Sequence, residues 1–216
     1  MTDVWSQRAE AFRESPTHKE GPDLDLLVEW CEPGAGVKVL DVATGGGHVA
    51  RRLREEGCTV VTVDPAPGMR PDVVAPAEDL PFEDGGFDVV TCRIAAHHFG
   101  DVHKAIAEMA RVTQHLVVIE DNIFVDRALE EAERLRDPTH VRCYSEEEWK
   151  KMLTDAGLDV EQVERFERHP VFEDWLTRVG TPPDDARHVR ELLGDRIDNG
   201  LLTLKSIVVK ARRSQT

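Results

Sequence analysis

Short apolar runs rich in β-branched residues alternate with helical patterns along most of the chain. The runs span residues 37–42, 59–63, 87–92 and 116–119, and helices are expected to open after the first, third and fourth of them, at His48, Val102 and Asp126. Such alternation predicts βαβ units, that is, a mainly parallel sheet with helices on both faces. The last of these runs, Leu-Val-Val-Ile, is typical of a strand buried on both sides. The fold class is therefore α/β, Rossmann-like and doubly wound.

The length of 216 residues favours one domain with small additions. Residues 1–22 are polar and are interpreted as a mobile N-terminal lid segment, which leaves residues 23–216 for the domain. Two further strands are expected at 160–168 and 201–211. The stretch between them, about residues 170–196, reads as an insertion of one or two helices that caps the substrate.

Composition excludes several classes of partner. The chain has 27 Lys+Arg against 42 Asp+Glu, a net charge of −15. This acid excess argues against binding to nucleic acid and against attachment to anionic lipid. No apolar run reaches the ~18 residues of a membrane span, and the charged N-terminus does not resemble a signal peptide, so we expect a cytoplasmic protein without a stable membrane anchor. The four cysteines form no CxxC pair, which favours reduced thiols over a zinc site.

A glycine cluster follows the first predicted strand, and an acid ends the second. Gly45-Gly46-Gly47 would let the backbone approach a ligand at the carboxyl edge of the sheet, next to a helix N-terminus. Asp64 stands where an acid can accept hydrogen bonds from ribose hydroxyls. Together they predict an adenosine-type ligand. Gly45, Gly47 and Ala50 also match the dinucleotide fingerprint, so NAD stays open at this point.

The sequence resembles the class I S-adenosylmethionine (SAM)-dependent methyltransferases. Residues 41–47, DVATGGG, resemble their E/D-x-G-x-G-x-G loop, with Ala43 in place of the first glycine. Residues 77–88, AEDLPFEDGGFD, resemble a block of the UbiE-like (ubiquinone/menaquinone-biosynthesis) members. Residues 15–24, 91–99 and 134–141 are similar to small uncharacterised bacterial members. The resemblance implies a seven-stranded sheet with the last strand antiparallel, and it suggests a quinone precursor as acceptor only by analogy.

The resemblance also implies residue roles. Asp41 and the backbone from Ala43 to Gly47 would hold the methionine part of SAM, Asp64 the ribose, and Met69 the adenine, while Arg93 would border the methyl group. The Ala77 backbone and the side chain of Glu78 or Asp79 would read the adenine edge. The full expected cofactor set is Asp41, Ala43, Thr44, Gly45, Gly47, Asp64, Pro65, Met69, Ala77, Glu78, Asp79 and Arg93.

The sequence departs from the family pattern in three places. Residues 65–76 are too short and proline-rich for the usual helix and full third strand, so the sheet should be shortened at that edge. Pro76 stands where an acid is common, which leaves the adenine edge to Glu78, Asp79 or the backbone. Residues 111–116 lack the usual Lys-Pro-Gly-Gly turn before the fifth strand.

Histidines supply the candidate catalytic groups, since a hydroxyl or phenol acceptor would profit from a base that titrates near neutral pH. His97 and His98 follow the fourth strand, and His140 stands in the RDPTHVR segment. We take His98 and His140 as the catalytic candidates. No metal site is expected, because no carboxylate or cysteine stands at a recognised ligand spacing from these histidines.

These observations predict a SAM-dependent methyltransferase that acts on a small-molecule acceptor, as a monomer or homodimer. The absence of an Asn/Asp-Pro-Pro-Tyr motif after the fourth strand argues against a DNA amino-methylase. Two alternatives stay open: an NAD(P)-binding oxidoreductase, and a SAM-binding protein without turnover.

Overall fold

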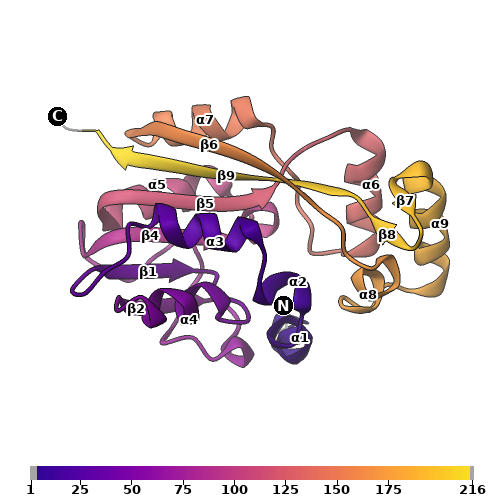
Figure 1. Cartoon of the computed structure of the whole chain (residues 1–216), viewed down its shortest axis with the longest axis horizontal. Coiled ribbons are helices and arrows are strands. Elements are labelled where there is room, and N and C mark those ends of the chain that lie inside the picture. Colours follow the sequence, from indigo (N-terminus) through magenta and orange to yellow (C-terminus); the bar gives the residue numbers. More distant parts are fainter. Residues whose placement is uncertain (1–3, 215–216) are drawn as a thin grey trace.

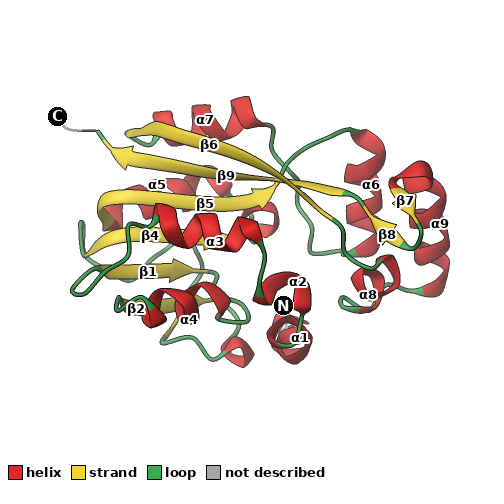
Figure 2. Cartoon of the chain, viewed as in Figure 1, coloured by secondary structure: helices red, strands yellow, loops and turns green. Residues whose placement is uncertain are grey.

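A computed structural model describes residues 4–214 of the chain. Seven strands form one sheet in the order β3-β2-β1-β4-β5-β9-β6 (Figures 1 and 2). Neighbouring strands from β3 to β5 pair in parallel, whereas β9 runs antiparallel to both β5 and β6. The predicted Rossmann-like sheet with its last strand antiparallel is therefore confirmed.

The strands and helices of the parallel half lie close to their expected positions. The strands are β1 (Lys38–Val42), β2 (Thr59–Asp64), β3 (Val73–Val74), β4 (Phe87–Arg93) and β5 (Thr113–Asn122). The helices that accompany them are α3 (Pro22–Trp30), α4 (His48–Glu55), α5 (Val102–Val112) and α7 (Glu146–Asp155), with short 3-10 turns η1 (Pro67–Met69) and η2 (Ala96–His98). With two residues, β3 is the shortened edge that the proline-rich segment predicts.

Helices cover both faces of the sheet, as the alternating pattern requires. On one face, Leu24, Leu27 and Val28 of α3 and Leu53 of α4 pack with Val39 in one core. On the other face, the apolar residues of α5 and α7 pack in a second core around Leu40, Val90, Ile106, Trp149 and Leu153. Two apolar faces explain the unbroken apolar runs within the central strands, such as residues 116–119 of β5.

The antiparallel half carries a separate small subdomain. The two long strands β6 (Leu158–Arg168) and β9 (Leu204–Arg213) run beyond the rest of the sheet, toward α6 (Arg127–Arg136), α8 (Phe172–Thr177) and α9 (Pro183–Leu193) (Figure 1). These helices and the hairpin of β7 (Ile197–Asp198) and β8 (Leu201–Leu202) share their own apolar core, which includes Phe172, Trp175 and Val189. We call this unit, α6 with residues 170–202, the cap. The strand expected at 201–211 is interrupted at Thr203, because β8 pairs with β7 instead of β6.

The N-terminal segment is helical where the structure describes it. Helices α1 (Val4–Arg13) and α2 (Pro16–Lys19) precede α3, and residues 1–3 of the predicted lid lie outside the described part. Ala9 of α1 packs with Ala66 and Met69 beside η1, which is how this polar segment gains a fixed position. Within residues 4–214, no helix is long and apolar enough to span a membrane.

Candidate active site at the carboxyl edge of the sheet

A cavity that is partly open to solvent lies at the carboxyl ends of β1, β2 and β4. Most of the predicted cofactor set lines it: Asp41, Ala43, Thr44, Gly45, Asp64, Pro65, Met69, Ala77, Glu78 and Arg93. Ligands of open α/β sheets bind at this edge, so the position agrees with the sequence prediction. Of the two remaining residues, Gly47 caps α4 and Asp79 is exposed, and neither lines the cavity.

The loop after β1 is held by the first of two buried carboxylates. Asp41 is 1% exposed, and its Oδ2 accepts a 2.6 Å hydrogen bond from the Thr44 hydroxyl. Burial raises the pKa of Asp41 to about 7, so this carboxyl exchanges its proton near neutral pH. Ala43 takes φ +53 in the left-handed region, at the position where the family loop has a glycine.

Gly46 shows why the loop needs glycine at its centre. A Cβ on this residue would lie 2.7 Å from Nε2 of His48 and 2.9 Å from the carbonyl oxygen of Phe12. His48 is itself 3.1 Å from that carbonyl oxygen. The N-terminal segment therefore lies directly against the glycine loop, and the local sequence around the loop does not predict this contact.

Asp64, the second buried carboxylate, links the carboxyl ends of β1 and β2. Its Oδ2 accepts from the backbone N–H of Gly45 at 3.0 Å, and its Oδ1 accepts from that of Ala66 at 2.9 Å. Burial raises the pKa of this carboxyl despite those two hydrogen bonds. Each oxygen of a carboxylate can accept a second hydrogen bond, so Asp64 can still receive a diol.

Glu78 and Asp79, the two candidates for the adenine edge, are placed differently. Glu78 lines the cavity, and its Oε1 accepts from the backbone N–H groups of Gly100 and Asp101 at 3.0 and 3.3 Å. Asp79 is exposed and does not line the cavity, and its backbone N–H donates to the carbonyl oxygen of Pro76 at 3.2 Å. The geometry favours Glu78 and the Ala77 backbone for this role.

Arg93 is the centre of a buried ion cluster. Its guanidinium donates to Asp23 Oδ2 at 2.7 Å, to Glu120 Oε2 and to the carbonyl oxygen of His18 at 3.0 Å. The side chain therefore lines the cavity while its donors are engaged with α3, β5 and the N-terminal segment. Sequence reasoning missed Asp23, Glu120 and His18, because no local motif links residues so far apart in the chain.

His98 lies at the wall of the cavity with one ring nitrogen fixed. Its Nδ1 is 3.1 Å from the carbonyl oxygen of Thr139, which can only accept, and 3.2 Å from the Thr139 hydroxyl, which donates to Asp137 Oδ1 at 2.7 Å. We therefore assign the hydrogen to Nδ1 and the lone pair to Nε2. Nε2 has no hydrogen-bond partner among residues 4–214. Burial, together with the charge of neighbouring His97, lowers the pKa of His98 well below its ordinary value. The ring is therefore neutral near pH 7 and Nε2 can accept a proton, but the lowered pKa makes His98 a weaker base than an ordinary histidine.

His97 positions its neighbour and does not line the cofactor cavity. Its Nδ1 lies 2.5 Å from Asp121 Oδ1, and its backbone N–H donates to Asp121 Oδ2 at 2.8 Å. Burial opposes protonation, but the Asp121 carboxylate outweighs it and raises the pKa of His97. The centroids of the His97 and His98 rings are 4.1 Å apart, so the orientation of η2 depends on Asp121.

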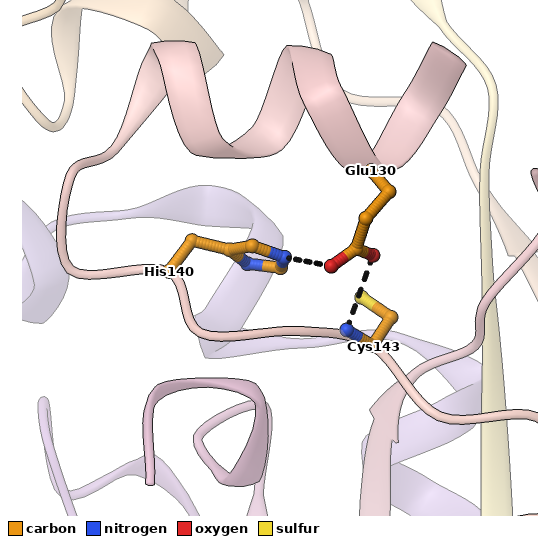
Figure 3. Close-up of side chains that lie close together, drawn as sticks. All are labelled: Glu130, His140 and Cys143. Atoms are coloured by element: carbon orange, nitrogen blue, oxygen red, sulfur yellow. Dashed lines mark hydrogen bonds and ion pairs between the residues drawn. The ribbon is translucent and has the colours of Figure 1, made fainter. Parts of the chain in front are cut away.

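His140 is not brought to the cavity. It contacts Glu130 Oε1 through Nε2 at 3.2 Å, and Glu130 Oε2 accepts from the backbone N–H of Cys143 at 3.2 Å (Figure 3). The ligand atoms of these three residues lie within 4.8 Å of one another. However, burial raises the pKa of the Cys143 thiol, and the other ring nitrogen of His140 is buried without a partner, whereas metal-bound histidines usually donate through it. Hydrogen bonding accounts for the cluster, and the expectation of no metal stays a prediction.

The strand order, the single antiparallel strand and a cavity between the ends of β1 and β4 define a class I methyltransferase fold. A family model described as a methyltransferase domain matches residues 6–163, and the chain belongs to this family as a small UbiE-like bacterial member.

Individual relatives agree with this placement. The chain is 33% identical over 208 residues to the uncharacterized methyltransferase YcgJ of Bacillus subtilis (strain 168), covering 86% of this chain and 82% of that protein. The crystal structure of the YcgJ protein superposes with a TM-score of 0.81 at 28% identity, over 90% of this chain and 99% of that one. A demethylmenaquinone methyltransferase of Renibacterium salmoninarum is 40% identical over 99 residues, covering 41% and 42% of the two chains. The oxidoreductase alternative is not favoured by any of these matches.

Replacing Ala43 with glycine should stabilise the protein slightly. A left-handed conformation costs an alanine roughly 1–2 kcal/mol, and the added flexibility of an unfolded glycine returns roughly 0.5–1 kcal/mol of that. We therefore expect Ala43→Gly to raise the free energy of unfolding in urea by about 0.5 kcal/mol. The control is Ala66→Gly, at φ −97, which should only destabilise. A loss of stability in Ala43→Gly as large as in the control would contradict the strain at Ala43.

Proposed function

We propose that the chain transfers a methyl group from SAM to a small-molecule acceptor and releases S-adenosylhomocysteine. The observation that supports this proposal most is that one cavity is lined by two buried carboxylates, Asp41 and Asp64, each hydrogen-bonded to the glycine loop. SAM presents an ammonium group, which Asp41 would bind, and a ribose diol, which Asp64 would bind.

The cavity fits this cofactor in its remaining parts. Asp64 has acceptor capacity left for a diol, and the buried Met69 offers an apolar surface to the adenine. The Ala77 backbone and Glu78 would contact the adenine edge. Bound SAM supplies an electrophilic methyl group on a sulfonium, whose neutral leaving group needs little chemical assistance.

This chain's own residues would then position the acceptor and remove a proton. Positioning and exclusion of water can supply most of the acceleration of an in-line displacement. For an acceptor with an O–H or N–H group, His98 would take the proton on Nε2 while Nδ1 stays bonded to the Thr139 carbonyl. His140 keeps no part in this proposal, because its ring lines neither this cavity nor a neighbouring one.

The N-terminal segment and the cap would close over the acceptor as a lid. Arg8 of α1 donates to both oxygens of Asp137 at 3.1 Å and to the carbonyl oxygen of Val179 in the cap at 2.7 Å. Trp5 and Phe12 of the same helix line the cavity. A closed pocket of this kind suits a small molecule, whereas the acid excess disfavours nucleic acid.

Calorimetry should show binding of SAM and S-adenosylhomocysteine but not of NAD. We expect Asp64→Ala to weaken SAM binding by roughly tenfold or more, because a buried hydrogen-bond acceptor is lost. The exposed Asp79 provides the matched control, and Asp79→Ala should stay within about twofold of the wild type. Binding of NAD alone, or equal SAM affinity in both variants, would refute the assignment.

A screen of many acceptors tests turnover. If it releases no S-adenosylhomocysteine from a protein that binds SAM, the alternative of SAM binding without turnover would hold.

SAM affinity should rise with pH between about 6 and 7.5. The ammonium group of the ligand favours ionised Asp41, whose pKa of about 7 in the free protein means that binding expels its proton. Above that window the α-amino group of the ligand loses its own charge, at a pKa of roughly 7.7–8.0. Calorimetry in two buffers of different ionisation enthalpy measures the released proton. Asp41→Asn should abolish the release, and an unchanged proton release in that variant would contradict the role of Asp41.

His98 should remain neutral well below pH 6.5. Nitrogen-15 NMR of the imidazole rings, with His98 assigned by comparison with His98→Gln, should show the Nδ1–H tautomer at pH 6, because burial and His97 disfavour its cation. His188→Gln, at an exposed position of α9, serves as the control and should leave the His98 signal unmoved. A pKa of His98 at or above the ordinary histidine value would contradict the effect that burial and His97 have on this ring.

A further inference from the structure

A second, smaller cavity adjoins the cofactor cavity and is partly open to solvent. Both cavities are lined by Phe12, His18, Ile94 and His98, so the two spaces meet at the candidate base. The other walls come from the ends of β5 and β6 and from the cap. A molecule in this cavity would lie beside the position expected for the methyl group.

Three guanidinium groups line this second cavity, namely those of Arg136, Arg168 and Arg178. Among the described residues that line it, the one carboxylate is Asp137, which is already paired with Arg8 at 3.1 Å. This concentration of positive charge stands out in a chain with a net charge of −15.

Two of the three arginines lack a charged partner. Arg136 is paired with Glu133 at 3.2 Å, whereas neither Arg168 nor Arg178 has a carboxylate within ion-pair distance in residues 4–214. Arg168 donates to the side-chain oxygen of Asn122, but its Nε is buried without any hydrogen-bond partner.

Within residues 4–214 the Arg178 guanidinium makes one hydrogen bond, from Nη2 to the Thr17 hydroxyl at 3.3 Å. Burial and the neighbouring charges of Arg136 and Arg168 lower the pKa of Arg178 to about 10, although the nearby Asp174 acts in the opposite direction. Like charges that share a partly dry cavity repel one another unless an anion neutralises them.

Acidic residues outside the second cavity do not neutralise its excess of positive charge. Asp23 and Glu120 feel the charge of Arg168, but both carboxylates are hydrogen-bonded to Arg93. Burial also raises the pKa of Glu120 to about 8, which lowers its negative charge at neutral pH.

We propose that this second cavity is the acceptor site and that it takes acidic small molecules, whose carboxylate or phosphate group is held between Arg168 and Arg178. This inference rests on the proposed methyltransferase function and specifies its substrate class. An uncharged quinone precursor would leave both half-buried guanidinium groups without a counterion, so it fits the cavity less well.

Methyl transfer to such an acceptor needs only SAM and one base. A lone pair on the acceptor's O–H or N–H atom forms the new bond to the methyl carbon, and the carbon–sulfur bond breaks with its electrons passing to sulfur. S-adenosylhomocysteine leaves neutral at sulfur, and the acceptor's proton passes to Nε2 of His98. The oxyanion takes no part in these steps, because its role is to fix the position of the acceptor.

The test is to titrate the full chain, saturated with S-adenosylhomocysteine, with inorganic phosphate and separately with benzoate. We expect saturable binding of at least one probe, and the stronger probe identifies the preferred oxyanion. Arg178→Gln and Arg168→Gln should each weaken that binding by about tenfold or more, since charge-assisted hydrogen bonds are lost. Arg187→Gln removes the same charge from an exposed position of α9 and should change nothing.

The outcomes separate this inference from the function on which it rests. If S-adenosylhomocysteine itself fails to bind, the proposed function fails. If it binds but neither probe saturates, or if all three variants bind the probes equally, only the acidic-acceptor proposal is overturned. The melting temperature gives an independent readout, because loss of a repelled charge in Arg178→Gln should leave it unchanged or higher. A lower melting temperature with full probe affinity would show a purely structural arginine.

Discussion

Three consecutive polar residues at the end of β5 determine how the two cavities are built. Glu120 holds Arg93, Asp121 holds His97 and Asn122 accepts from Arg168. Buried polar groups are stable only when they are paired, so each of these contacts fixes an element that neighbours β5. Glu120 thereby anchors the wall of the cofactor cavity, Asp121 orients the turn that carries His98, and Asn122 places a guanidinium in the second cavity.

The same three residues mark a limit of sequence reasoning. The apolar run 116–119 predicts the core of β5, but the strand extends to Asn122 because its polar end is buried against cationic partners. Hydropathy records only that Glu120 and Asp121 are charged. Their partners come from distant segments, so their burial becomes visible only in the folded chain. By contrast, β1, β2 and α5 are predicted almost to the residue, because local apolar periodicity decides them.

The candidate site also has a part that local motifs predict and a part that depends on contacts between distant segments. Asp41, Asp64 and the glycine loop follow from a contiguous motif at strand ends, and the structure brings them together in one cavity. Arg93 was expected beside the methyl group, but its donors are taken by Asp23, Glu120 and the carbonyl of His18. The N-terminal helix was also missed, since α1 is polar overall and is placed by a few contacts with the η1 turn rather than by periodicity.

The acid excess of the chain and its arginine-lined cavity act over different distances. Charges on the surface are screened beyond a Debye length of about 8 Å at physiological ionic strength, so the net charge of −15 only weakly opposes entry of an anion. Inside the cavity the effective dielectric constant is lower, and each guanidinium interacts more strongly with a bound oxyanion than it would in water. Arg168 stands at the last residue of β6, paired in register with Leu204 at the start of β9, and Arg178 directly follows α8. The long antiparallel pair therefore carries the cap and also determines how far the cavity's arginines lie from His98, the proposed base.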